Sequence, residues 1–111
     1  MGYDRDLADR IRRAVPARTA EKPMFGGLSF LVGGNMAIGV IDDRMVVRVG
    51  PDTYEDALAE PNVREMDFTG RAMRGWVYVE PKAIASDDDL ASWVARGISF
   101  ARSLPAKRPA G

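Results

Sequence analysis

Residues 28–49 read LSFLVGGNMAIGVIDDRMVVRV, three short apolar runs separated by the segments GGN and DDR. These segments are typical of tight hairpin turns, because Gly, Asn and Asp tolerate the backbone conformations that such turns require. Short apolar runs bounded by turns indicate strands. We therefore expect an antiparallel meander of three strands, at residues 28–32, 36–41 and 45–49.

Helices are expected before, between and after the strands. Apolar residues recur at helical spacing over residues 4–15, and again in a longer segment that opens at Ser86. Ser86 followed three residues later by Asp89 resembles a capping box, which marks the start of a helix. A short helix is expected after Pro51, because proline suits a first helical position and acidic residues follow it.

Two further strands are expected at residues 63–68 and 74–80, and the segment PARTAEKP at 16–23 reads as a linker into the sheet. The element order is then α-β-β-β-α-β-β-α. Strands grouped in runs with separating helices indicate the α+β class, here a mainly antiparallel five-stranded sheet with helices on one face. We expect one domain over the whole chain, with frayed ends at 1–3 and 105–111.

Composition limits the chemistry that this chain can perform. The 111 residues include no cysteine and no histidine, which excludes thiolate and imidazole catalysis and the usual zinc sites within one chain. Sixteen basic residues balance sixteen acidic ones, so no surplus of positive charge favours nucleic acid or an anionic membrane. No signal peptide or apolar span is visible, and we expect a cytoplasmic protein without catalytic residues, cofactor or metal.

The glycines offer a phosphate-binding alternative that the sequence does not favour. Gly34 and Gly39 have the first spacing of a P-loop, but the residues that follow continue a strand instead of supplying Lys and Ser or Thr. We interpret Gly26 and Gly27 as a bend or bulge where a strand enters the sheet. Gly39, inside a strand, indicates close approach by a helix or another backbone.

Two acidic runs carry simpler interpretations than a metal site or a carboxylate pair. Residues 42–43 fall in an expected turn, where Asp is common, and adjacent turn residues point apart. Residues 87–89 fall in the first turn of the last helix, where acidic side chains favour the helix dipole. Neither run predicts catalysis or metal binding.

The segment TGRAMRGW, residues 69–76, is the strongest candidate for a binding site. Arg71 and Arg74 lie close in sequence to Trp76, and a guanidinium beside an indole can bind an anion or stack on a base. The alternative is that these arginines bind carboxylates of neighbouring segments and that the tryptophan is core. Arg48 is a related case, or an ordinary charge on the solvent side of its strand. The candidate contacts to a ligand or partner are therefore Arg48, Arg71, Arg74 and Trp76.

The last expected strand is apolar on both faces. Trp76 and Tyr78 should point one way, and Val77 and Val79 the other. Because helices should cover one face only, one of these pairs would face outward, and an exposed apolar patch usually marks an interface. We therefore expect a homodimer or a protein partner.

Three segments resemble the N-terminal domain of TfoX/Sxy-type proteins: MFGG at 24–27, GRAMRGWVYVEP at 70–81 and LASWVARGISFARSLP at 90–105. The resemblance covers residues 22–105. It implies a bacterial regulator of natural competence and an α+β unit likened to secretion chaperones, without established catalytic residues. Two-domain members add a helical C-terminal domain, so this chain resembles the stand-alone form.

These observations together predict a non-enzymatic regulatory or protein-interaction module. The alternative is a domain that binds a small anion or a nucleotide through Arg48, Arg71 and Arg74 beside Trp76. We expect no direct contact with nucleic acid or membrane, because the charges balance and no apolar span is present.

Overall fold

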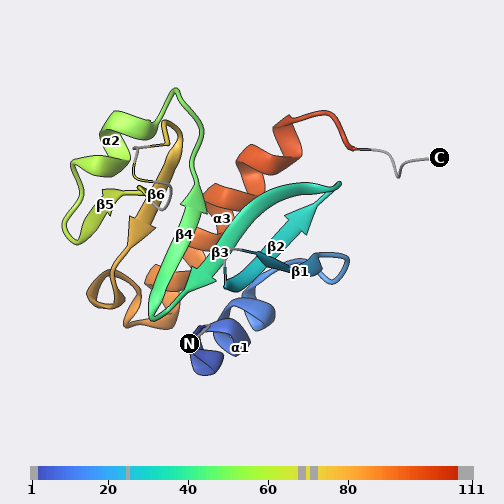
Figure 1. Cartoon of the computed structure of the whole chain (residues 1–111), viewed down its shortest axis with the longest axis horizontal. Helices are drawn as coiled ribbons and strands as arrows, with labels where there is room; N and C mark the ends of the chain where they lie inside the picture. Colours follow the sequence, from blue (N-terminus) through green and yellow to red (C-terminus); the bar gives the residue numbers. More distant parts are fainter. Residues whose placement is uncertain (1–2, 25, 68–69, 71–72, 108–111) are drawn as a thin grey trace.

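A computed structural model describes residues 3–24, 26–67, 70 and 73–107 of the chain (Figure 1). Within this part, six antiparallel strands form one sheet in the spatial order β1-β2-β3-β4-β6-β5. The elements are α1 (Arg5–Ala14), β1 (Ala20–Met24), β2 (Gly27–Val32), β3 (Asn35–Ile41), β4 (Arg44–Arg48), α2 (Tyr54–Leu58), β5 (Val63–Glu65), β6 (Trp76–Val79), a 3-10 turn η1 (Pro81–Ile84) and α3 (Asp87–Ser103). The predicted α+β class is confirmed, with six strands in place of five.

The additional strand is β1, which begins halfway along the segment that we expected to be a linker. The expectation was wrong because β1 lies at the edge of the sheet with four of its five residues exposed, so it lacks the alternation that identifies a strand. An edge strand has a neighbour on one side only, so Pro23, which has no N–H to donate, is tolerated in β1. The pairing of Met24 with Gly27 makes the glycine pair part of a β1–β2 hairpin turn. The bulge falls later, where Phe30 and Leu31 of β2 face Ile38 and Met36, so that Ala37 of β3 is the extra residue.

The predicted meander of three strands is confirmed as β2, β3 and β4. The β2–β3 turn consists of Gly33 and Gly34, whose φ angles of 59° and 80° favour glycine. Asn35, expected in the turn, begins β3 and is buried. Its Nδ2 donates to the carbonyl of Pro105 at 2.9 Å, and the amide of Lys107 donates to the carbonyl of Gly33 at 2.7 Å. The segment after α3, expected to be frayed, thus lies against this turn up to residue 107.

The main core lies between the sheet and the helices. Helices α1 and α3 cover one face, and α3 crosses β3 and β4 (Figure 1). The fully buried apolar residues at this interface include Ile11, Phe30, Ile38, Val47 and Val77. The predicted cap of α3 is confirmed, since the amide of Asp89 donates to Ser86. Helix α1 begins one residue later than expected, because Asp4 is its cap and accepts from the amide of Leu7.

Gly97 sets how closely α3 approaches the sheet. A Cβ atom at this position would lie 2.5 Å from the carbonyl oxygen of Ala37 and 2.9 Å from Cγ1 of Ile38. Both distances are too short for a side chain, so the helix backbone rests almost directly on β3.

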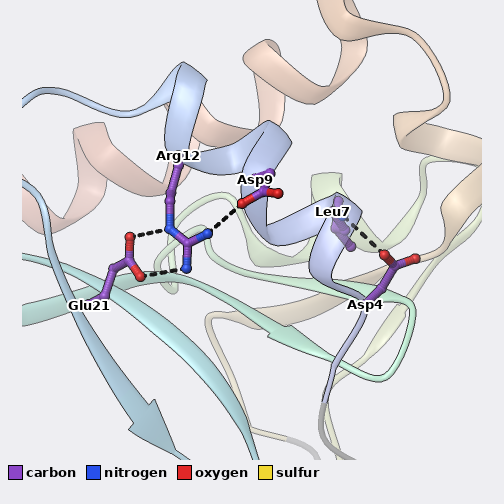
Figure 2. A network of polar contacts seen from close by, with 5 residues as sticks. All are labelled: Asp4, Leu7, Asp9, Arg12 and Glu21. Atoms are coloured by element: carbon purple, nitrogen blue, oxygen red, sulfur yellow. Dashed lines mark hydrogen bonds and ion pairs between the residues drawn. The ribbon is translucent and has the colours of Figure 1, made fainter.

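Helix α1 is tied to the edge strand β1 by charged side chains (Figure 2). Arg12 donates from Nε and Nη2 to both carboxylate oxygens of Glu21, at 2.6 and 2.8 Å, and from Nη1 to Asp9 at 2.6 Å. This paired geometry holds the pKa of Glu21 below its ordinary value of 4.5 and raises the pKa of Arg12. The contact fixes an edge strand that has few apolar contacts of its own.

Replacing Glu21 with Gln is expected to lower the melting temperature slightly at pH 7, and the difference from wild type should disappear on acidification. Because the folded state lowers the pKa of Glu21, its contribution is fully present above the unfolded value of 4.5 and is lost as pH falls through the folded value. Thermal melts of both proteins between neutral and acid pH measure this. Glu65→Gln is the control, since Glu65 is exposed and forms no ion pair with any described residue. An undiminished difference at acid pH would contradict the prediction.

Candidate functional site

The face of the sheet opposite α1 and α3 carries its own apolar cluster. The alternation predicted for the last strand is confirmed: Val77 and Val79 enter the main core, whereas Trp76 and Tyr78 lie on the opposite face. We call the residues on that face the second-face cluster. It consists of buried Met36, Ile41, Val46, Met66 and Tyr78 and partly buried Met24, Met73 and Trp76.

Only part of the second-face cluster reaches solvent. Tyr78 is 2% exposed, so the expectation that it faces outward with Trp76 is wrong for Tyr78. The cover comes from Arg44, whose guanidinium lies 3.9 Å from the centre of the Tyr78 ring, and from the connection between β5 and β6. Burial raises the pKa of Tyr78 above its ordinary value. Trp76, Met73 and Met24 form the accessible border of the cluster.

The connection between β5 and β6 explains why both strands are shorter than predicted. The amide of Met73 donates to the carbonyl of Met66 at 3.0 Å, which brings the two ends of the connection together. Met66 therefore leaves the ladder after Glu65 and places its side chain in the second-face cluster, where it is 1% exposed. Gly75 has a φ of 95°, and β6 begins only after it.

Gly39 makes room on the second face. A Cβ there would lie 2.7 Å from the methyl carbon of Met36 and 3.3 Å from the carbonyl oxygen of Leu28. The expected close approach is therefore made by a side chain and by the neighbouring strand, and not by a helix.

Arg48, at the end of β4, lies beside two aromatic rings that come from different elements. It pairs directly with Trp76 across the β4–β6 ladder, and its guanidinium carbon is 4.8 Å from the centre of that ring. The ring of Phe100, in α3, is 5.3 Å away. Burial lowers the pKa of Arg48, because the charged form loses water on this side. Three elements thus converge on one guanidinium.

Phe100 reaches Arg48 because Gly50 has no side chain. A Cβ at Gly50 would lie 2.5 Å from two carbons of the Phe100 ring. Beyond the ring is a cleft of about 560 Å³ between α3 and the residues that follow β4, with Thr53, Ser99 and Ser103 among its hydroxyl-bearing walls. Phe100 was not among the predicted site residues, because it falls outside the apolar stripe of the last helix.

Arg74, another predicted arginine, does not join this arrangement. Arg74 is exposed, forms an ion pair with Glu55 at 3.3 Å, and lies 5.5 Å from the ring centre of Tyr54. It therefore follows the alternative interpretation, in which an arginine binds a carboxylate of a neighbouring segment. Arg71 lies outside the described residues. Of the four candidates, the structure brings together Arg48 and Trp76.

The acidic runs occupy the positions expected for turns and caps. Asp42 has a φ of 55° in the β3–β4 turn, and its carbonyl accepts from the amide of Asp4. The described residues contain no group of three or more acidic side chains arranged to hold a metal. None of the described helices combines the length and the apolar character needed to cross a membrane.

The fold is therefore a small α+β domain whose sheet is packed by helices on one face and carries a methionine-rich cluster on the other. A family model, the TfoX N-terminal domain, matches residues 12–101 of the chain. The chain belongs to this family, which confirms the resemblance seen in the sequence. Searches of curated proteins and of solved structures returned no significant match.

Proposed function

We propose that this chain is a regulatory module that acts by binding protein, without catalysis of its own. The observation that carries the proposal is the second-face cluster, which contains four methionines (Met24, Met36, Met66 and Met73) and a half-buried tryptophan. Methionine side chains are flexible and polarisable, and they are over-used at surfaces that adapt to a partner. Tryptophan is enriched among the residues that contribute most to binding.

The family supports the regulatory part of the proposal. The chain belongs to the TfoX N-terminal domain family, and its resemblance to competence regulators favours a role in control over a role in metabolism. We place the protein in the bacterial cytoplasm, with its accessible border of Met24, Met73 and Trp76 against a second copy or another protein.

Met73→Glu and Met24→Glu test the proposal. Both residues are partly buried at the border of the cluster, and a carboxylate there would have to be desolvated against a partner. We expect either variant to weaken association at least tenfold. Light scattering over a range of concentrations measures self-association, and affinity capture from the host followed by mass spectrometry identifies another partner.

Ser92→Glu, on the exposed side of α3, is the matched control and should leave association unchanged. Circular dichroism establishes that all three variants are folded. A wild type that remains monomeric at high concentration and captures no specific partner would count against the proposal. Equal losses in Ser92→Glu and Met73→Glu would show that the second face is not the binding surface.

A further inference from the structure

Arg48 has an unusual environment among the basic residues of the chain. Within the described residues, four arginines are half-buried, and three of them (Arg10, Arg44 and Arg96) have a carboxylate within 4.0 Å. Arg48 is the fourth and has none. All sixteen acidic side chains of the sequence fall within the described residues, so no Asp or Glu side chain of this chain lies within 4.0 Å of Arg48.

The protein also satisfies few of the hydrogen-bond donors of Arg48. A guanidinium presents several N–H groups in a rigid planar fork. The described residues provide one acceptor, the carbonyl of Met36, at 3.5 Å from Nη1. No described residue accepts a hydrogen bond from the other nitrogens of Arg48.

Withdrawing a cation from water without a counter-charge is unfavourable. Trp76 and Phe100 offset part of this penalty through cation–π contacts with the guanidinium. An aromatic ring attracts the charge but does not replace a carboxylate as a hydrogen-bond acceptor for the N–H groups.

We propose that Arg48 is a receptor for an oxyanion, and that the oxyanion is an Asp or Glu carboxylate of the protein that covers the second-face cluster. The inference rests on the proposed function. Trp76 links the two features, since it belongs to the second-face cluster and stacks on Arg48. A partner that lies on the cluster would place an acidic residue over Arg48 and its apolar neighbours over Trp76 and Met73. A carboxylate fits the guanidinium fork through two parallel hydrogen bonds.

A matched pair of peptides tests this inference. The probes are acetyl-Leu-Glu-Leu-Phe-amide and its Gln counterpart, titrated into the wild-type protein while NMR follows the Arg48 Nε–H and Trp76 Nε1–H signals. We expect both signals to shift with the Glu peptide, which should bind about tenfold more tightly than the Gln peptide. Since this comparison uses the wild-type protein, it does not depend on the folding of any variant.

Substitutions then assign the preference to one residue. Arg48→Met should abolish the preference for the Glu peptide, and Arg48→Lys should keep only part of it, because lysine retains the charge and loses the fork. Arg18→Met is the control: Arg18 is exposed and pairs with no described carboxylate, so the preference should be unchanged.

Equal binding of the two peptides, or no binding of either, would overturn the inference. Titration with inorganic phosphate is a second test. Saturable phosphate binding that Arg48→Met abolishes, without a preference for the Glu peptide, would overturn the partner carboxylate in favour of a free anion. None of these results decides the proposed function, which is judged by association of Met73→Glu and Met24→Glu and can stand while the role of Arg48 fails.

Discussion

Valine in place of Gly97 is expected to lower the free energy of unfolding by about 3 kcal/mol. The first atom of any side chain at this position meets the carbonyl oxygen of Ala37 at 2.5 Å and Cγ1 of Ile38 at 2.9 Å. The carbonyl belongs to the β3 backbone, where the next residue, Ile38, pairs with Phe30 of β2 and with Val47 of β4, so the backbone cannot move aside freely. Helix α3 would have to lift from the sheet. Urea denaturation followed by circular dichroism measures the loss.

Ser99→Val separates the clash from the intrinsic preference of valine against helix. Ser99 is exposed in the same helix, so valine there should cost less than about 1 kcal/mol. Gly97→Ala should fall between the two, because its better helix propensity offsets part of the overlap. If Gly97→Val were as stable as Ser99→Val, α3 would not be seated on β3 as described.

Alanine in place of Phe30 should have a similar or larger effect, a loss of about 3–5 kcal/mol. The Phe30 side chain is 0% exposed at the centre of the main core, where it lies opposite Ile38 in the β2–β3 ladder. Removing the ring leaves a cavity that the surrounding strands and helices cannot close completely. Chemical denaturation with unchanged m-value would identify a loss of packing without a change in the unfolded state.

Two control substitutions show whether the loss of stability in Phe30→Ala comes from the core position. Phe30→Leu retains most of the volume and should cost less than about 1.5 kcal/mol. Leu31→Ala alters the next residue, which is only half-buried, and should cost about 1 kcal/mol. A Leu31→Ala variant less stable than Phe30→Ala would indicate that the core lies on the other face of β2.

Local patterns predicted the elements whose signals are contained in their own residues. The cap at Ser86 and the hairpin at Gly33 and Gly34 depend on residues within a few positions of one another. The opposite orientations of Trp76 and Val77 follow from the period of a strand. Strand β1 had no such signal, because an exposed edge strand shows neither alternation nor an apolar run.

The site depends on distant pairings, and sequence patterns do not specify them. Arg48 and Trp76 meet because β4 pairs with β6 in a particular register, across a connection that contains α2 and β5. Phe100 joins them from α3 only because Gly50 leaves space for its ring. Arg74 is close to Trp76 in the sequence, yet its guanidinium pairs with Glu55 of α2. Proximity along the chain pointed to Trp76 but paired it with the wrong arginine, and it gave no indication of Phe100.

Pro23 affects how this molecule behaves in a crowded solution. It lies in the outermost strand of the sheet, beside Glu21 and Lys22. Proline has no N–H to offer, and charged neighbours discourage another polypeptide from aligning there. The β1 edge of the sheet is therefore expected to resist the growth of fibrils by strand addition. Met24 and Met73 can therefore remain accessible on the second face while β1 offers no long template for aggregation.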